Sequence, residues 1–245
     1  MNNGTMELSS VLDFLKNADK KYSNEKICEI SVTQKKEYKD KLEKCIMYNE
    51  MHAKDKDAPK DLDKKKGDSL EELASYLLQI SGGLFTIDRN VRTATNEIDQ
   101  IFKLTTKGNI LLSANIIDRR YKLFLGECKN YKTSVSVTYI GKFCSLLLTN
   151  NIKLGILFSY HGISGSGWSY GAGLIKKFYL HKEKEEERFC IIDFSIEDFK
   201  KIEEGHNFLE IVESKINALR LDTDYERFLD THPAQDLLKA SQKSC

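Results

Sequence analysis

Two charged residues, Glu127 and Lys129, follow an apolar run that reaches Gly126. Because the side chains of a strand alternate between two faces, both lie on one face together with Leu123 and Leu125. Charged side chains are seldom buried without a partner, a metal or a chemical role. Here the carboxylate could bind a divalent cation, and the ammonium could hold a water molecule or a phosphate. A strand that ends at Gly126 and leaves both charges in water is the commoner explanation of such a pattern.

Two further acids stand in unexpected places. Asp99 lies inside an expected strand over residues 95–104, although aspartate is depleted in strands and costly in a core. Glu71 lies on the flank of the buried face of an expected amphipathic helix. We expect that helix to begin at Ser69, with Glu72 completing a capping box.

These acids suggest a metal site. If the strands that carry Asp99 and Glu127 are neighbours, both carboxylates can reach one Mg²⁺ ion, which prefers oxygen ligands and keeps several waters. A metal held in this way activates water and stabilises the charge that develops on a phosphate. Lys129 would then position or deprotonate the attacking water.

Composition limits the possible functions. At 245 residues the chain can hold one large or two small domains, and its formal charge of +1 indicates no general affinity for nucleic acids, so a basic surface would have to be local. The six cysteines form neither a C-x-x-C motif nor a zinc-finger pattern with histidine. No segment approaches the roughly 20 apolar residues of a membrane span. We therefore expect no membrane partner and a reducing, cytoplasmic location.

The chain divides by composition into three expected parts. Residues 1–66 are charge-rich, have apolar residues at helical spacing over 11–15 and 38–46, and end in a solvated connector over 54–66. The alternative is a helical arm that docks a partner protein or a second copy. Residues 67–220 hold the order helix, strand, strand, strand, helix (135–150), strand (153–159), which predicts an α/β fold with a central mixed sheet and helices on both sides. Residues 221–245 form a tail.

Shorter segments carry further expectations. We expect a turn over 88–90, a turn near 106–109, and a charged hairpin tip over 181–188. The glycine-rich stretch 162–173 has Trp168 where a Walker phosphate loop requires lysine, so we expect a mobile loop that carries Trp168 and Tyr170.

Taken in order, these motifs resemble the PD-(D/E)xK nuclease superfamily and, within it, the Mrr-like restriction endonucleases. The motifs that carry the resemblance are Gly67-x-x-Leu70-Glu71-x-Leu73, Asn96-Glu97-Ile98-Asp99 and Glu127-Cys128-Lys129. The resemblance implies that Asp99 and Glu127 bind the metal, that the backbone carbonyl of Cys128 adds a ligand, that Lys129 is the catalytic lysine, and that Glu71 supports the site. Ile98 replaces the proline that gives the superfamily its name. Glu127-x-Lys129 is the general superfamily form, whereas Mrr-like members often carry Gln-x-Lys.

The resemblance also implies a fold and a function. It implies a restriction-endonuclease-like core, Mg²⁺ as cofactor with Mn²⁺ as a substitute, and hydrolysis of DNA phosphodiester bonds in restriction or other defence against foreign DNA. One alternative is a structure-selective nuclease of the junction-resolvase kind, which predicts a homodimer and a local basic surface. A second is a nuclease-like module that binds nucleic acid or a partner without cutting, although buried acids with no metal to hold would only cost stability. A purely structural domain is the remaining interpretation, because single acids do occur at strand ends without a function.

Overall fold

The fold is built on a mixed five-stranded sheet. The computed structural model describes residues 20–54, 60–92, 97–224 and 229. The strands lie side by side in sequence order: β1 (Phe85–Arg92), β2 (Glu97–Leu104), β3 (Leu123–Lys129), β4 (Leu154–Ser159) and β5 (Cys190–Phe194). β1, β2 and β3 pair antiparallel, whereas β3, β4 and β5 pair parallel. The expected α/β fold with a mixed sheet is confirmed.

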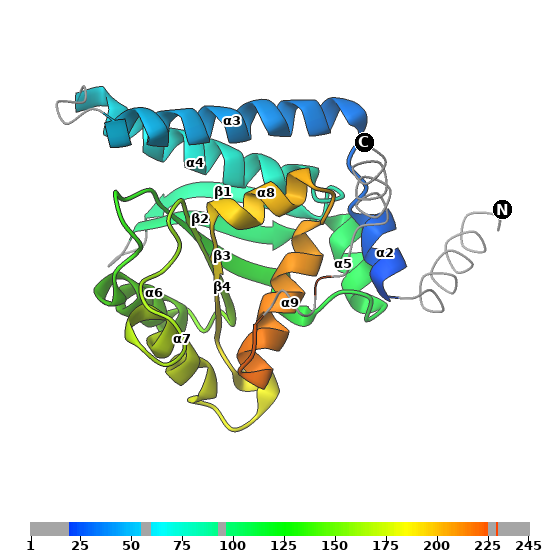
Figure 1. The fold of residues 1–245 in the computed structure, drawn as a ribbon. Coiled ribbons are helices and arrows are strands. Elements are labelled where there is room, and N and C mark those ends of the chain that lie inside the picture. Colours follow the sequence, from blue (N-terminus) through cyan, green and yellow to red (C-terminus); the bar gives the residue numbers. More distant parts are fainter. Residues whose placement is uncertain (1–19, 55–59, 93–96, 225–228, 230–245) are drawn as a thin grey trace, which may run out of the picture.

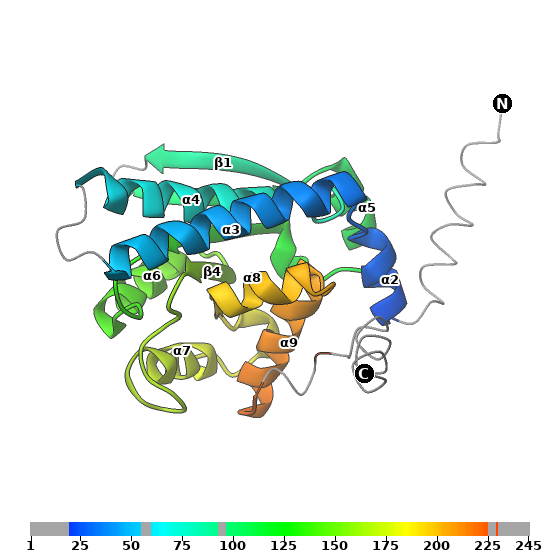
Figure 2. The same cartoon turned by 45° about the horizontal axis from the view of Figure 1, so that its top comes forward.

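Helices cover both faces of this sheet (Figures 1 and 2). They are α2 (Lys20–Ile27), α3 (Val32–Lys54), α4 (Lys60–Ile80), α5 (Thr106–Ser113), α6 (Val137–Thr149), α7 (Tyr170–Leu180), α8 (Ile196–Glu203) and α9 (Phe208–Leu221). On one face, α6 and α7 pack on a cluster that includes Leu125 of β3 and Leu157 of β4. On the other face, α4, α8 and α9 pack on a cluster that includes Phe124 of β3 and Phe158 of β4. The expected helices on both sides of the sheet are therefore present.

Gly126 lets β3 pass close to its neighbour. A Cβ atom at this position would lie 2.4 Å from Cε2 of Phe102, whose ring stacks on that of Phe124 with centroids 4.8 Å apart. Only glycine fits beside that ring without a shift of the core, because such interiors are close-packed. The aromatic packing thus fixes the strand just before Glu127.

The start of α4 corrects several expectations. α4 begins at Lys60, so residues 60–66 are helical rather than a solvated connector, and Ser69 lies inside the helix, where its hydroxyl donates to the carbonyl of Lys66. Glu72 is not part of a capping box, because it pairs with Lys41 and Lys44 of α3. α3 lies along α4 in both views, and this packing extends the helix beyond the point that local sequence indicates (Figures 1 and 2).

The boundary expected after residue 66 therefore falls within α4. Ile27 of α2 and Tyr38 and Leu42 of α3 belong to the same apolar cluster as the inner residues of α4. At least part of the predicted docking arm is thus packed on the rest of the chain. The first predicted helix, around Val11 to Leu15, lies outside the described residues.

Four shorter segments also differ from the expected structure. β1 continues through the turn expected over 88–90, because Asp88 and Arg89 pair with β2. α5 replaces the turn near 106–109, and the hydroxyl of Thr105 caps it by accepting from the backbone N–H of Gly108. The hairpin tip expected over 181–188 is wrong: β4 and β5 are parallel, and α7 is the crossover between them. α7 also begins at Tyr170, within the stretch expected to be a loop.

Within the described ranges, none of the helices combines the length and the apolar character that a membrane crossing would need.

Candidate active site

β2 and β3 separate at the end where the predicted site residues lie. Their pairing runs from Lys103 opposite Leu123 to Gln100 opposite Gly126. One residue further along β2, the carboxylate of Asp99 accepts a hydrogen bond from the backbone N–H of Cys128 at 3.4 Å. At this point the Asp99 side chain, rather than a backbone carbonyl of β2, accepts the hydrogen bond from β3. The Asp99 carboxylate therefore lies at the end of β3.

The Lys129 ammonium lies between two carboxylates at this point. Its Nζ atom is 3.0 Å from Oδ2 of Asp99 and 2.8 Å from Oε1 of Glu127. The side chains of Lys129, Asp99 and Glu127 are 17%, 22% and 9% exposed, so this ion-pair cluster is largely removed from water. The structure therefore brings together three of the residues that the sequence singled out, while their catalytic roles stay predictions.

Glu71 approaches the cluster from α4. Its pKa is raised by burial, then by the negative charges of Asp99 and Asp68, and it is lowered in part by Lys129. One helical turn later, Ser75 accepts a hydrogen bond at 3.0 Å from the buried amide of Gln100, the neighbour of Asp99. This contact fixes α4 against β2 beside the site. Glu71 is thus an electrostatic neighbour of the ion-pair cluster, and no described hydrogen bond joins it to the three.

Tyr139 belongs to the site and was not predicted from the sequence. Its hydroxyl donates to Oε1 of Glu127 at 2.8 Å, and Nζ of Lys129 lies 5.1 Å from the centre of its ring. Its ring meets that of Tyr131 edge-on, with centroids 5.9 Å apart. The only sequence signal was its position in the expected helix over 135–150, next to Ile140 on the apolar side, and this does not reveal contact with the end of β3.

The charges of the cluster stabilise one another. Burial alone would lower the pKa of Lys129, but Glu127, Tyr139 and Asp99 overcome this effect and raise it, so the ammonium stays charged at neutral pH. Burial raises the pKa of Glu127, and Lys129 and Tyr139 oppose that rise. Burial also raises the pKa of the Cys128 thiol well above its usual value, so this side chain is a neutral thiol rather than a thiolate ligand.

The fit of the site to a metal ion depends on its two carboxylates. In the part of the chain that the structure describes, no three His, Cys, Asp or Glu side chains are grouped so that they could hold a metal ion. Oxygens of Asp99 and Glu127 nevertheless both lie within 3.0 Å of a single cationic atom, Nζ of Lys129. Mg²⁺ is commonly held by one or two carboxylates, with waters completing its shell. The residues therefore fit a Mg²⁺ ion with few protein ligands.

Comparison of this chain with protein-family models, with curated proteins and with solved structures finds no match.

Proposed function

We propose that the protein is a Mg²⁺-dependent endonuclease that hydrolyses DNA phosphodiester bonds, with a role in restriction or other defence against foreign DNA. The observation that carries the proposal is the ion-pair cluster of Asp99, Glu127 and Lys129, formed where two neighbouring strands separate. The element order around it, from α4 through β4, supports it too, because this order accompanies the motifs that resemble PD-(D/E)xK nucleases. We propose the restriction-endonuclease-like core on the same grounds.

The charge of the site suits a divalent cation and a phosphate. With all four groups ionised, the carboxylates of Glu71, Asp99 and Glu127 and the ammonium of Lys129 carry two net negative charges. A bound Mg²⁺ ion would supply Lewis-acid activation of the phosphate and of a water molecule. Asp99 and Glu127 would hold that ion, and the backbone carbonyl of Cys128 is the third proposed ligand.

The protein's own groups would then act on the substrate directly. Because the pKa of Lys129 is raised, its ammonium would donate hydrogen bonds to a phosphate oxygen or to the attacking water rather than remove a proton. Glu71, whose pKa is raised by burial, is the better candidate to accept a proton from that water. Tyr139 would position Glu127 through its hydroxyl.

A plasmid-cleavage assay tests the proposal. Wild type is compared with Asp99→Ala and Lys129→Ala in Mg²⁺ and in Mn²⁺. The sheet also offers a matched control, because Asp88 of β1 and Lys103 of β2 form a second ion pair, with side chains 48% and 51% exposed. We expect metal-dependent nicking or linearisation that falls roughly 100-fold or more in the two site variants, as on loss of a group that stabilises developing charge. Asp88→Ala and Lys103→Ala should cleave like wild type.

Two results would contradict the proposal. Cleavage that persists in both Asp99→Ala and Lys129→Ala would mean that the chemistry takes place elsewhere. If wild type cuts none of plasmid, modified, branched and single-stranded DNA with either metal, the alternative of a nuclease-like module that binds without cutting becomes the better account.

A further inference from the structure

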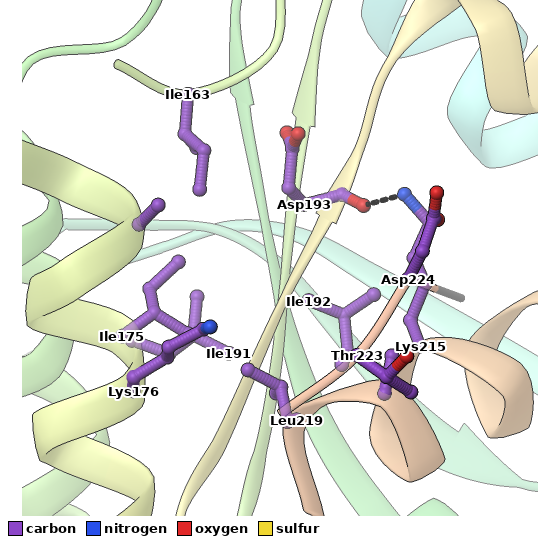
Figure 3. Close-up of a pocket in the computed structure, with 12 residues that line it drawn as sticks. Ile163, Ile175, Lys176, Ile191, Ile192, Asp193, Lys215, Leu219, Thr223 and Asp224 are labelled. Atoms are coloured by element: carbon purple, nitrogen blue, oxygen red, sulfur yellow. Dashed lines mark hydrogen bonds between the residues drawn. The ribbon is translucent and has the colours of Figure 1, made fainter. Parts of the chain in front are cut away.

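A cavity of about 210 Å³ lies beside the edge strand β5, between α7 and α9 (Figure 3). Its walls are largely apolar and include Ile175 of α7, Ile191 of β5 and Leu219 of α9. Asp193 and Lys215 supply polar groups on the β5 and α9 sides, as the view of the pocket shows (Figure 3). Its size is below the ~300 Å³ at which sites for drug-sized ligands begin, so it suits a single small ring system.

The two lysines that line this cavity already have partners. Nζ of Lys215 donates to the backbone carbonyl of Asp193 and to the carboxylate of Asp198, both at 2.7 Å. Lys176 pairs with the carboxylate of Asp222. Because both lysines have acidic partners, the cavity favours a neutral ligand over a phosphate.

One carboxylate gives the cavity hydrogen-bonding capacity. Asp193 accepts a hydrogen bond from the hydroxyl of Ser159 at 3.3 Å, and burial raises its pKa to about 6. A carboxyl group that titrates near neutrality can either accept or donate a hydrogen bond. It can therefore pair with a ligand edge that carries both donors and acceptors.

One exposed aromatic side chain lies close to the cavity. Trp168 is 50% exposed. The indole N–H of Trp168 donates to Asp222 at 3.1 Å, and Nζ of Lys176, a lining residue, lies 5.4 Å from the centre of the indole ring. An aromatic ring held beside a cavity offers a stacking surface to a planar ligand.

The cavity lies within reach of the candidate active site. Lys129 pairs with Ser159 across β3 and β4, and Ser159 binds Asp193 of β5. Two strand spacings amount to about 10 Å. Because successive bases along one DNA strand are about 3.4 Å apart, this offset corresponds to a few nucleotides.

We infer that this cavity binds a nucleobase of the nucleic acid substrate, with Trp168 stacking at its mouth and Asp193 bonding to the edge of the base. A nucleobase is neutral, planar and rich in both donors and acceptors, as the lining requires. Enzymes that bring a base out of the stack hold it in such a pocket, through edge hydrogen bonds and contacts with apolar or aromatic side chains. The inference rests on the proposed nuclease function, since it takes the base to be part of a substrate bound at Lys129.

The fluorescence of Trp168 tests the inference without any cleavage, because this is the only tryptophan of the chain. The four deoxynucleoside monophosphates and a short single-stranded oligonucleotide are titrated in EDTA. We expect saturable quenching of the emission in wild type and also in Lys103→Ala, whose ion pair with Asp88 lies on β1 and β2, away from the cavity beside β5.

Cavity-filling variants make the test specific. Ala218→Phe fills the cavity from α9 and Ala172→Leu fills it from α7, since both alanines line it. We expect either change to weaken binding by about 10-fold or more, the range of one lost base-stacking contact. Ala218→Ser keeps the cavity open and should behave like wild type. Two filling variants on opposite walls guard against a fold defect in one of them.

The outcomes separate this inference from the proposed function. The nucleobase site is refuted if no probe gives saturable quenching. It is also refuted if both filled variants are quenched as strongly as wild type. Plasmid cleavage without quenching would remove the nucleobase site alone. Quenching that is lost in the filled variants, in a protein that cleaves no DNA, would leave a nucleotide-binding pocket and refute the nuclease.

Discussion

Replacement of Lys129 by alanine should reveal how the two carboxylates beside it are held. The ammonium forms ion pairs with both Asp99 and Glu127, at 3.0 and 2.8 Å. Its removal leaves two acids facing each other in a place that is largely closed to water. Breaking a buried ion pair on one side costs about 3 to 5 kcal/mol in general. Because the groups are partly exposed, we expect a loss of about 3 kcal/mol in the free energy of unfolding at neutral pH.

Lys103→Ala is the matched comparison. Lys103 and Asp88 form the same kind of pair on the same sheet, but about half of each side chain is in water. We expect this change to cost at most about 0.5 kcal/mol. For a domain of this size, 1 kcal/mol corresponds to roughly 2–4 °C in the melting temperature, so Lys129→Ala should melt roughly 6–12 °C below wild type and Lys103→Ala within about 2 °C of it.

The loss in Lys129→Ala should also depend on pH. Burial raises the pKa of Glu127 above its ordinary value of 4.5, and loss of Lys129 removes a charge that lowers it. A carboxyl group whose pKa is higher in the folded than in the unfolded protein binds more protons when folded. Its cost is therefore absent below the unfolded pKa and grows as the pH rises through the folded pKa. We expect Lys129→Ala to lose less of its free energy of unfolding, relative to wild type, at pH 5 than at pH 8.

Urea denaturation followed by circular dichroism at both pH values measures this difference. A loss that is the same at pH 5 and pH 8 would show that the ammonium does not compensate the two carboxylates. A loss no larger than that of Lys103→Ala would refute the burial argument itself.

Two neighbours of the cluster give sharper tests of its electrostatics. Tyr139→Phe removes the hydroxyl that bonds Glu127 and keeps the ring. We expect a loss of about 1 kcal/mol in the free energy of unfolding and a higher pKa of Glu127, measured by NMR titration. An unchanged pKa of Glu127 would contradict the contact. Glu71→Gln removes an acid whose pKa is raised by burial and by Asp99, so stability at neutral pH should stay the same or rise by up to about 1 kcal/mol while metal-dependent cleavage falls. A clear loss of stability in Glu71→Gln would show that this carboxylate is held by a favourable contact.

The central strands could be predicted from the sequence because their side chains are buried on both faces. The expected strand over 153–159 is β4, which is buried along its whole length. The apolar run over 121–125 that precedes Glu127 and Lys129 lies largely in β3, which begins at Leu123. The alternation of side chains correctly placed Glu127 and Lys129 on one face, and the presence of Asp99 in the next strand followed from its apolar flanks, Ile98 and Ile101.

The segments that could not be predicted depend on contacts between distant parts of the chain. α4 extends back to Lys60 because α3 covers it, and no local pattern records that packing. The polar residues over 88–90 look like a turn, yet they form part of β1 because β2 pairs with Asp88 and Arg89. In both cases the local sequence favoured another structure, a helix start at Ser69 or a turn over 88–90, and contacts with a distant part of the chain outweighed it.

The ion-pair cluster links stability to the proposed chemistry. Lys129 neutralises the same two carboxylate oxygens that would bind a divalent cation. An ion that enters between Asp99 and Glu127 must therefore compete with the ammonium, and the released Lys129 becomes available to a phosphate beside the metal. Once an ion has displaced it, Lys129 no longer has the acidic partners that raise its pKa, and burial then lowers that pKa. If Asp99 and Glu127 bind a metal as proposed, such a site keeps its acids balanced until metal and substrate arrive together, which would be a physical reason for a lysine to stand two residues after Glu127.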